Sequence, residues 1–402
     1  MSESIFHLAM RRAIVLAQRG FPAVAPNPAV GAVLIKGNRI VAEGWHEQFG
    51  QSHAEVNCLA DAARKKVNPA ECSMVVTLEP CNHHGKTPPC TEAILRAGVK
   101  HVMVGFSDPT SQARGGAAFL TTNGVKVESG PYAEECHNLI RDFLFWQKSS
   151  LPYTSLKMAC TLDGFIATRS GKSRWITGGD ARERVHVLRS QNQAVLIGGG
   201  TLHADNPLLS VRLDGTRKYA EDREGTSGAP DWLCLERPQS FTQPLAVVLS
   251  SRKLDLSNLP RLVTERGEQT VFLTGMGSDL AKQSVALKEF GVRVFEFDSV
   301  NKFEFSSDNL KQMLIFLRKE LNVWRLFSEG GSRLGLNFLR AGLVQQFELH
   351  MAPCLIADKE AVNLFEGMSP DTIDEARAAV PLEVARLGTL GQDVVIQFYP
   401  GK

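Results

Sequence analysis

One histidine, one glutamate and two cysteines in the first hundred residues have the types and spacing of a catalytic zinc site. His53 and Glu55 stand two positions apart, and Cys81 ends the segment TLEPC, nine positions before Cys90. One imidazole and two thiolates leave the fourth position of a tetrahedral zinc open for water. A carboxylate beside the metal can take the proton of that water and return it to a leaving group. The residues therefore predict zinc at His53, Cys81 and Cys90, with Glu55 as the catalytic acid/base.

Plainer interpretations of these residues stay open at this point. An isolated His-x-Glu is common, and most buried cysteines are small core residues. A structural zinc with His83 or His84 as a fourth ligand would use the same groups. We interpret the other cysteines as structural: Cys58, Cys72, Cys136, Cys160, Cys234 and Cys354.

Two glycine-rich turns in the second half of the chain each follow a predicted strand. They are GGGT at 198–201 and SEGGS at 328–332. Backbone N–H groups at such turns can approach a phosphate, so the pair indicates a nucleotide site at the carboxyl edge of a sheet. Tight turns without a ligand remain an alternative, because His203 replaces the third glycine of G-x-G-x-x-G.

Two series of alternating helices and strands must position these groups. In the first series, apolar patterns predict helices at 6–17, 54–65 and 91–97, and strands at 29–35, 73–78, 102–105 and 125–127. After a linker at 148–152, a second series has predicted strands at 154–159, 194–197, 245–249, 271–274, 292–297 and 323–328, and helices at 181–191, 280–290, 310–319 and 334–341. We therefore expect two α/β domains, 1–147 and 148–402, with a polar surface insertion at about 213–243.

Length and composition agree with this division and exclude several classes of protein. The 402 residues are 43% hydrophobic and 22% charged, which is typical of a globular protein of two or three domains. The formal net charge of +2 provides no basic tail for a nucleic-acid partner. No apolar run approaches the roughly 18 residues of a membrane helix, and the first twenty residues lack a signal peptide. We expect a cytoplasmic protein without nucleic-acid or membrane partners.

The first half resembles the deaminase domain of the bifunctional deaminase/reductases of riboflavin biosynthesis. PNPAVG at 26–31, GWH at 44–46, HAE at 53–55 and TLEPCNHHGKTPPC at 77–90 carry the resemblance. The H-x-E…P-C…C pattern is shared by zinc-dependent nucleobase deaminases, and the long spacer between the cysteines separates this family from the others. The resemblance implies a small phosphorylated diaminopyrimidinone substrate whose 2-amino group is replaced. It further implies that Asn27 and His46 contact that substrate and that Lys86 meets its phosphate.

The second half resembles the reductase domain of the same family, whose fold is similar to that of dihydrofolate reductase. KMACTLDG at 157–164, SGKSRWITG at 170–178, GGGTLHADNPLLSVR at 198–212 and SEGGSRL at 328–334 carry this resemblance. In that family NADPH reduces C1′ of the ribosyl group to a ribityl chain. The implied NADPH-lining residues are Ala159, Trp175, Thr201, Asp205, Gly331, Ser332, Arg333, Leu334, Gly335, Leu336 and Asn337. The implied substrate contacts are Lys157, Ser173, Arg189, Leu209, Arg212 and Glu329.

The two resemblances together predict one bifunctional enzyme with Zn²⁺ and NADPH as cofactors. Its fold class would be a cytidine-deaminase-like α/β/α domain followed by a dihydrofolate-reductase-like α/β domain, assembled as a homo-oligomer, either a dimer or a tetramer. The chain departs from the family pattern in the loop after Asp108, at Thr110, Ser111, Gly116 and Ala117, and in the reductase half at Gln193, Asn206, Gln345 and Gln346. A monofunctional deaminase with a degenerate, structural reductase domain is therefore the alternative. A structural zinc protein that binds nucleic acid is a third hypothesis, which the near-neutral charge disfavours.

Overall fold

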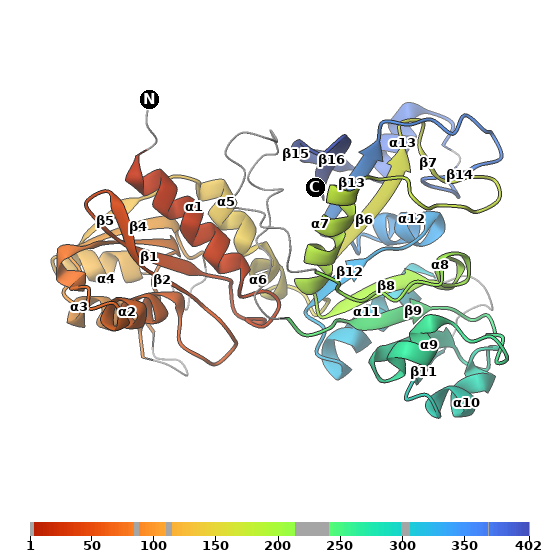
Figure 1. Ribbon diagram of the computed structural model, residues 1–402, viewed down its shortest axis with the longest axis horizontal. Helices are drawn as coiled ribbons and strands as arrows, with labels where there is room; N and C mark the ends of the chain where they lie inside the picture. The colour runs from red at the N-terminus through yellow and green to blue at the C-terminus, as the bar shows by residue number, and fades with distance from the viewer. Residues whose placement is uncertain are drawn as a thin grey trace. The chain divides into compact units, whose positions relative to one another are not determined.

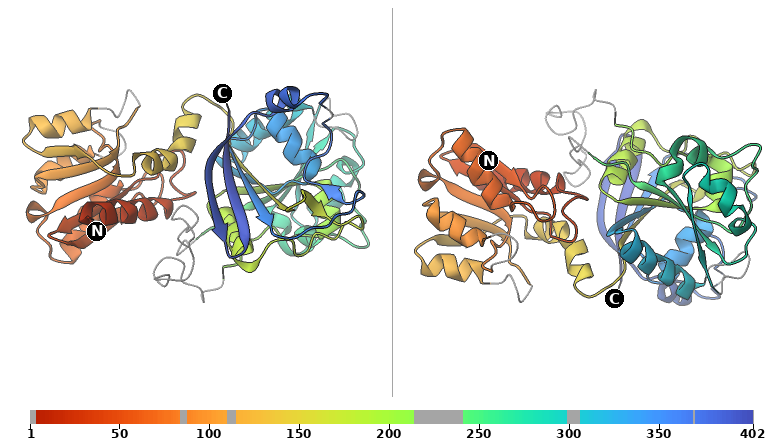
Figure 2. Two further views of the ribbon diagram at one scale, coloured as in Figure 1. Left: turned by 90° about the horizontal axis from the view of Figure 1, so that it is seen from above. Right: turned by 90° about the horizontal axis from the view of Figure 1, so that it is seen from below.

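The computed structural model describes residues 4–83, 88–109, 115–213, 241–298, 306–368 and 370–401 (Figure 1). These residues divide into two compact units, one ending at Ser149 and the other beginning at Ser150. Each unit is built on its own sheet, and Figure 2 shows helices lying against both faces of each sheet. None of the helices in the described ranges is long and apolar enough to cross a membrane.

The first unit is a five-stranded sheet in the order β2-β1-β3-β4-β5. Its strands are β1 (Gly31–Lys36), β2 (Arg39–Trp45), β3 (Ser73–Leu78), β4 (His101–Phe106) and β5 (Lys126–Ser129). β1 is antiparallel to β2 and to β3, whereas β3, β4 and β5 are parallel. Of the parallel strands, β3 and β4 are buried on both faces, which explains the apolar residues at the centre of β3, whereas β5 at the edge is partly exposed.

Helices cover both faces of this sheet and make a three-layer α/β/α domain. They are α1 (Ile5–Gln18), α2 (Ala54–Arg64), α3 (Cys90–Arg96), α4 (Gly116–Thr122), α5 (Ala133–Leu139) and α6 (Arg141–Trp146), with a short 3₁₀ helix η1 (Pro69–Glu71). Met10 and Ala13 of α1 pack with Val33 and Val75 on one face. On the opposite face, Ala54, Cys58 and Ala62 of α2 join a second cluster. The fold class predicted for the first domain, a cytidine-deaminase-like α/β/α domain, is confirmed.

The second unit is a nine-stranded sheet in the order β11-β10-β9-β8-β12-β6-β13-β16-β15. Its strands are β6 (Tyr153–Thr161), β8 (Ala194–Gly198), β9 (Leu245–Leu249), β10 (Thr270–Gly275), β11 (Arg293–Phe297), β12 (Arg325–Ser328), β13 (Gln346–Ala352), β15 (Leu382–Leu390) and β16 (Asp393–Pro400). The strands from β11 to β13 are parallel, and β16 and β15 add an antiparallel edge. A small separate sheet pairs β7 (Phe165–Ala167) with β14 (Val362–Asn363).

The chain crosses from β8 outward to β9, β10 and β11 and then returns to place β12 between β8 and β6. Seven helices and two 3₁₀ turns connect the strands in the described part of this unit. The helices are α7 (Gly179–Ser190), α8 (Gly199–Asp205), α9 (Arg261–Arg266), α10 (Ser284–Lys288), α11 (Ser307–Glu320), α12 (Ser332–Arg340) and α13 (Ile373–Ala379), and the 3₁₀ turns are η3 (Gly267–Gln269) and η4 (Ala281–Gln283). Ligands of open α/β sheets bind outside the carboxyl ends of the strands at such a reversal. The ends of β8, β12 and β6 are therefore the place to expect the second site.

Several elements differ from the sequence-based expectations. The predicted helix 280–290 is broken into η4 and α10, and β2, β13, β15 and β16 were not predicted. Most of the expected insertion 213–243 lies outside the described residues. The fold class predicted for the second domain, a dihydrofolate-reductase-like α/β domain, is confirmed. The structure divides after Ser149, and the exact domain boundary at 147/148 stays a prediction.

Candidate active sites

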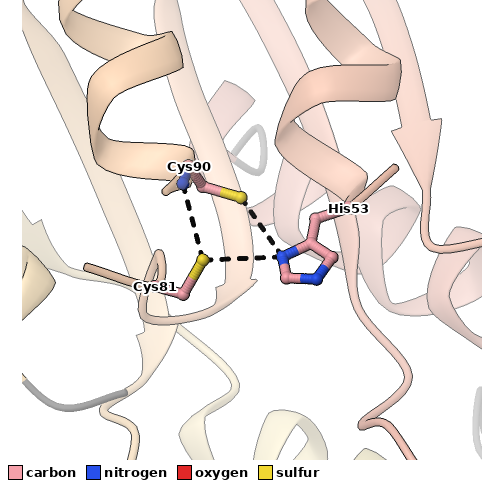
Figure 3. A group of neighbouring side chains, drawn as sticks. All are labelled: His53, Cys81 and Cys90. Carbon is pink, nitrogen blue, oxygen red and sulfur yellow. Dashed lines mark hydrogen bonds between the residues drawn. The ribbon is translucent and has the colours of Figure 1, made fainter. Parts of the chain in front are cut away.

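The three predicted zinc ligands lie together at the carboxyl end of β3. His53 is the residue before α2, Cys90 is the first residue of α3, and Cys81 follows β3. Nδ1 of His53 is 3.5 Å from Sγ of Cys81 and 3.4 Å from Sγ of Cys90 (Figure 3). Within the described ranges, this is the one group of three histidine, cysteine or acidic side chains close enough to hold a metal.

The ligand spacing fits a tetrahedral zinc ion. Zinc–nitrogen and zinc–sulfur bonds of ordinary length place an imidazole nitrogen and a thiolate about 3.6 Å apart. The two measured separations match that value, and His83, which is exposed, is not part of the group. Three protein ligands within the described residues leave one position open, which is the arrangement of catalytic zinc; His84, the other candidate fourth ligand, lies outside those residues.

Glu55 lies beside this group on the first turn of α2. Its side chain is buried, with 3% of the residue exposed, and it is close enough to Cys90 for a hydrogen bond. Burial raises the pKa of the Glu55 carboxyl, because a charged carboxylate loses its hydration there. A carboxyl group with a raised pKa beside a metal site is suited to take up a proton and to release it again.

Asn27 and His46 form a hydrogen-bonded pair next to the zinc ligands. Nδ2 of Asn27 lies 3.1 Å from Nε2 of His46, and Nδ1 of His46 lies 3.0 Å from the carbonyl oxygen of Ser52. A carbonyl only accepts, so His46 carries its proton on Nδ1 and accepts from Asn27 on Nε2. Burial lowers the pKa of His46, which favours this neutral form. The imidazole of His46 also packs edge-on against that of His53 at 5.2 Å. Lys86 lies outside the described residues.

Glu79, which the sequence did not single out, ties the loop after β4 to the zinc-bearing turn. Its carboxylate accepts backbone N–H groups of Asp108 at 3.1 Å, Gly115 at 3.1 Å and Ala117 at 2.9 Å. Gly116 packs against the same turn, since a Cβ there would lie 1.8 Å from the carbonyl oxygen of Pro80. The departure from the family pattern at Gly116 thus meets a steric requirement for glycine. In the sequence, the only indication of this role is the presence of Glu79 within the motif TLEPC.

A cavity of about 1520 Å³ occupies the predicted position in the second unit. Ligand pockets for one drug-sized molecule are usually ~300–1,000 Å³, so this cavity has room for two ligands. Most of the predicted reductase residues line it: Lys157, Ala159, Ser173, Trp175, Arg189, Thr201, Asp205, Leu209, Arg212, Glu329, Gly331, Ser332, Arg333, Leu334 and Asn337. The exceptions are Gly335, which packs on Met158, and Leu336, which is 3% exposed in the core.

Arg189 and Glu329 form a fork-to-fork ion pair on the cavity wall. Nε and Nη2 of Arg189 donate to the two carboxylate oxygens of Glu329 at 2.5 and 2.7 Å, and Nη1 donates to the carbonyl of Ser210 at 2.9 Å. Although burial opposes ionisation, Arg189 holds the pKa of Glu329 below its usual range. The N–H groups of Arg189 are therefore already engaged, and Arg212, which donates to Ser210 Oγ at 2.9 Å, carries the more available guanidinium.

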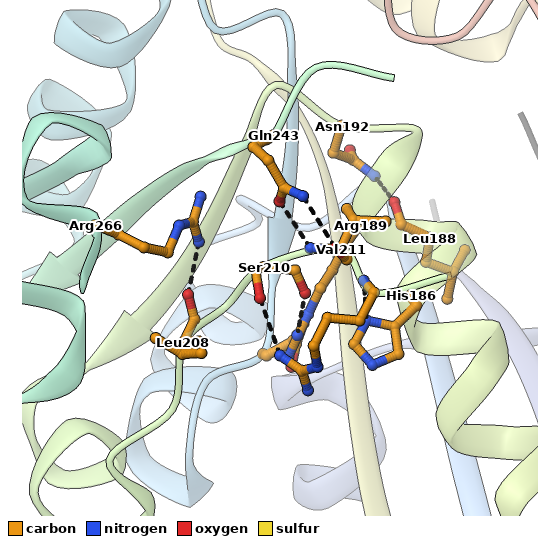
Figure 4. Close-up of polar contacts among 11 residues, drawn as sticks. His186, Leu188, Arg189, Asn192, Leu208, Ser210, Val211, Gln243 and Arg266 are labelled. Carbon is orange, nitrogen blue, oxygen red and sulfur yellow. Dashed lines mark hydrogen bonds and ion pairs between the residues drawn. The ribbon is translucent and has the colours of Figure 1, made fainter. Parts of the chain in front are cut away.

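The loop that carries Arg212 is fixed by side chains that the sequence did not indicate. The amide of Gln243 both accepts from and donates to the backbone of Val211, at 2.8 and 2.9 Å (Figure 4). Nδ1 of His186 accepts from the backbone N–H of Arg212 at 3.2 Å. Burial and the neighbouring arginines Arg189 and Arg212 lower the pKa of His186 to about 4. His186 is thus a neutral acceptor that orients the Arg212 backbone.

Lys157 reaches the cavity from the middle of the sheet. Burial lowers its pKa, while the carboxylates of Glu329 and Glu348 oppose that change. Glu348 lies opposite Lys157 in the β13–β6 register and belongs to a buried network. Arg184 donates to both of its oxygens, at 2.6 and 2.7 Å, and Nε2 of His350 donates to Oε1 at 2.6 Å. The sequence did not single out any member of this network.

Ser173, Asp205 and Trp175 lie at the mouth of the same cavity. Oγ of Ser173 donates to Oδ1 of Asp205 at 2.8 Å, which joins the loop after β7 to α8. The indole of Trp175 is 71% exposed, and the guanidinium carbon of Arg182 lies 4.6 Å from its ring centre. An exposed aromatic ring beside a cavity is available to stack on a planar ligand.

Comparison with known proteins agrees with both halves. Residues 4–106 match the cytidine and deoxycytidylate deaminase zinc-binding region, and residues 152–396 match the RibD C-terminal domain. The fold and sites thus define a zinc deaminase joined to a pyrimidine reductase. Full-length relatives narrow this class. The riboflavin biosynthesis protein RibD of Synechocystis is 46% identical over 86% of this chain and 84% of that protein, and RibD of Actinobacillus pleuropneumoniae is 34% identical over 97% and 94%. The chain belongs to the RibD family of bifunctional deaminase/reductases.

Two solved structures are similar along the whole chain. A diaminohydroxyphosphoribosylaminopyrimidine deaminase/5-amino-6-(5-phosphoribosylamino)uracil reductase from Thermotoga maritima has a TM-score of 0.74 and 28% identity, and covers 99% of both chains. RibD from Acinetobacter baumannii has a TM-score of 0.71 and 30% identity over the same coverage. The predicted family is therefore confirmed.

Proposed function

We propose that this enzyme acts twice on one phosphorylated pyrimidine. The first unit would convert 2,5-diamino-6-(5-phosphoribosylamino)pyrimidin-4-one into the corresponding uracil, with release of ammonia. The second unit would then reduce the ribosyl group to a ribityl chain with NADPH. The observation that carries this proposal is the presence, in one chain, of a three-ligand zinc cluster with a buried acid and of a cavity large enough for a dinucleotide and a substrate.

In the deaminase unit, His53, Cys81 and Cys90 would hold zinc. Bound zinc supplies a water of lowered pKa as the nucleophile. Glu55 would take the proton of that water and deliver it to the departing amino group, so that C2 gains oxygen and loses ammonia. Asn27 and His46 would orient the pyrimidine, because the hydrogen bond between them holds both side chains in one orientation toward the substrate. We assign the phosphate to Lys86 from the family resemblance alone.

In the reductase unit, NADPH supplies a hydride to C1′ of the ribosyl group. The ribose ring oxygen must then take a proton as the C1′–O bond opens. Lys157 faces the cavity and, within the described residues, donates no hydrogen bond, so its ammonium group can orient the sugar and supply that proton. Arg212 would bind the substrate phosphate, with Arg189 adding charge beside it, and Ser173 and Leu209 would line the same end of the cavity. Ala159, Trp175, Thr201, Asp205 and the turn at 331–334 would line NADPH together with Asn337.

Several features support an active rather than a degenerate reductase half. The family departures Asn206 and Gln193 have structural roles: Asn206 ends α8 at a φ of +43° and accepts the N–H of Arg261, and Gln193 accepts the N–H of Arg325. Gln345 likewise accepts the N–H of Thr154. An amide oxygen accepts a backbone N–H at each of these three positions, so a carboxylate is not required there.

Mass-resolved product analysis tests both reactions together. Without NADPH, the diaminopyrimidine phosphate is expected to gain one mass unit, because an oxygen atom replaces an NH group as water enters and ammonia leaves. With NADPH, the product is expected to gain two more. Deamination without reduction at saturating NADPH would contradict the bifunctional proposal and support the monofunctional alternative. Light scattering tests the remaining expectation of a homo-oligomer, dimer or tetramer, in a protein that we expect to be cytoplasmic.

A further inference from the structure

We propose that Glu348 is a positioning residue for Lys157: its buried carboxylate, fixed by Arg184 and His350, keeps the Lys157 side chain in the ammonium form that reduction requires. The inference rests on the proposed reductase function and adds to it a group that acts through Lys157. In that reaction C1′ gains a hydride from the coenzyme as the C1′–O bond breaks. The ring oxygen takes a proton from Lys157, whose amine then recovers a proton from water.

Lys157 and Glu348 lie side by side on adjacent parallel strands. They are paired in the register of β6 and β13, and the next pair on the same face is Ala159 with His350. Paired residues of neighbouring strands lie about 4.8 Å apart and project to the same side of the sheet. Lys157 and Ala159 line the large cavity, whereas Glu348 and His350 are 2% and 0% exposed. The charge of Glu348 therefore acts on Lys157 in the protein interior, where such an effect is stronger than in water.

Two side chains fix the carboxylate of Glu348. Arg184 on α7, itself buried, donates to both carboxylate oxygens, from Nε at 2.6 Å and from Nη2 at 2.7 Å. Nε2 of His350 donates to Oε1 at 2.6 Å, so Nδ1 of His350 carries no proton. This Nδ1 is buried and, among the described residues, has no hydrogen-bond partner.

Stability alone does not explain this cluster of Arg184, Glu348 and His350. A buried ion pair loses the hydration of both charges, and apolar side chains of similar volume stabilise a core as well or better. The unsatisfied Nδ1 of His350 adds a further cost. The cluster is better explained by what it does to its neighbour Lys157.

The titratable and charged groups that face Lys157 come from four elements: Glu348 and the neutral His350 on β13, Glu329 after β12, Arg189 on α7 and Asp393 on β16. Burial lowers the pKa of Lys157; the three carboxylates oppose this change, whereas Arg189, the bidentate partner of Glu329, adds to it. Burial raises the pKa of Asp393, which favours its uncharged form. Although burial opposes ionisation of Glu348, Arg184 holds the pKa of that carboxyl below its usual range. Glu348 is thus the carboxylate that maintains the charge on Lys157.

The pH dependence of reduction by the full-length protein tests this assignment. The single-turnover rate, and the KM of each substrate, are to be measured with NADPH and the deaminated pyrimidine between about pH 6 and 10. The variants are Lys157→Gln and the double variant Arg184→Met/Glu348→Gln, which removes the carboxylate at unchanged net charge and keeps an acceptor for His350.

The wild-type rate should fall at high pH, as Lys157 loses its proton. Without the carboxylate the ammonium form is less stable, so in the double variant this fall should begin at least about one pH unit lower. The KM values should stay within about twofold, because Glu348 does not line the cavity. Lys157→Gln should be slow at every pH and lack the fall, and Glu348→Asp, which keeps a carboxylate, should remain close to the wild-type profile.

Arg12→Met/Glu43→Gln is the matched control. It removes a bidentate ion pair of the first unit, with both hydrogen bonds at 2.8 Å, and should keep the wild-type profile of reduction. An unshifted fall in Arg184→Met/Glu348→Gln, an equal shift in the control, or a fall that persists in Lys157→Gln would overturn the proposal. Failure of the double variant to fold would assign the cluster to stability and overturn it as well. If the wild type did not oxidise NADPH, the proposed reductase function itself would fail.

Discussion

Glu55 is a buried carboxyl group beside three metal ligands, and its proposed role is to move protons rather than to bind zinc. Glu55→Gln keeps the shape of the side chain and removes its ability to exchange a proton. We expect the deamination rate to fall by at least about 100-fold, the usual contribution of a general acid/base, with zinc content unchanged. Loss of zinc from the variant would instead make Glu55 a ligand. Glu47→Gln, on the exposed segment after β2, is the control and should deaminate normally.

His350 makes the second unit sensitive to acid. Burial lowers the pKa of His350 to about 4, although its hydrogen bond to Glu348 opposes the change. The unfolded chain, with a histidine pKa near 6.5, therefore binds the proton first, and stability is lost as pH falls from about 6.5 to about 4. The lowered pKa of Glu348, which Arg184 maintains against burial, extends the loss to lower pH.

Calorimetry of the wild type and His350→Gln between pH 7 and 5 measures this effect. The transition that NADPH raises reports the second unit, because a ligand stabilises the unit that binds it. Its midpoint should fall with pH less steeply in His350→Gln than in the wild type. If the midpoint of His350→Gln fell with pH as steeply as that of the wild type, His350 would not be the cause of the acid sensitivity. The exposed His203→Gln should keep the wild-type slope.

At the scale of elements, Gly44 lets α2 approach β2 closely enough to form the zinc site. A Cβ at Gly44 would lie 2.2 Å from the backbone nitrogen of Cys58 and 2.6 Å from the carbonyl oxygen of Ala54. Gly44→Ala must displace the helix that begins after His53. We expect a loss of about 1–3 kcal/mol in unfolding free energy, typical of overpacking, together with weaker zinc binding and slower deamination.

Zinc titration, denaturant unfolding and both activities check the Gly44→Ala prediction. Reduction should continue at the wild-type rate, since the displaced helix belongs to the first unit. Gly179→Ala is the matched substitution, because a Cβ there would meet only Nη2 of Arg182 at 3.9 Å. Wild-type zinc affinity in Gly44→Ala would show that α2 adjusts without moving its first turn.

The elements that the sequence predicts well are those whose apolar residues are uninterrupted or regularly spaced. β3 spans the predicted strand 73–78 because both of its faces are buried. β13 was missed because QFELHMA carries two polar residues that burial would normally forbid, Glu348 and His350, and only their partner Arg184 makes that burial possible. β15 was missed because its apolar residues alternate irregularly with exposed ones.

The candidate sites divide in the same way. His53, Glu55, Cys81 and Cys90 belong to short motifs, so the sequence alone predicted that they meet. Glu79, His186 and Gln243 act through backbone groups of distant segments, and no local pattern reports such contacts. Their roles become visible only when the loops that they hold have been placed.

At the scale of the whole molecule, the metal stabilises one of two compact units. A chelator should therefore lower the thermal midpoint of the first unit and abolish deamination, because zinc binds the folded unit and not the unfolded chain. The transition that NADPH raises, and reduction of the deaminated substrate, should be unaffected. Calorimetry and separate assays of the two reactions with and without chelator check this. Parallel loss of both activities would show that the second unit depends on the metal as well.

The exposed indole of Trp175 lines the reductase cavity, so its fluorescence can report binding there. Its ring is 71% exposed with Arg182 stacked at 4.6 Å, whereas Trp146 is 9% exposed in the other unit. A dinucleotide that covers Trp175 would move this fluorophore out of water and bring it close to a nicotinamide that absorbs in the near ultraviolet. Quenching of indole emission and energy transfer to the reduced coenzyme would then report occupancy without a label, and Trp175→Phe would remove the part of the signal that this ring contributes.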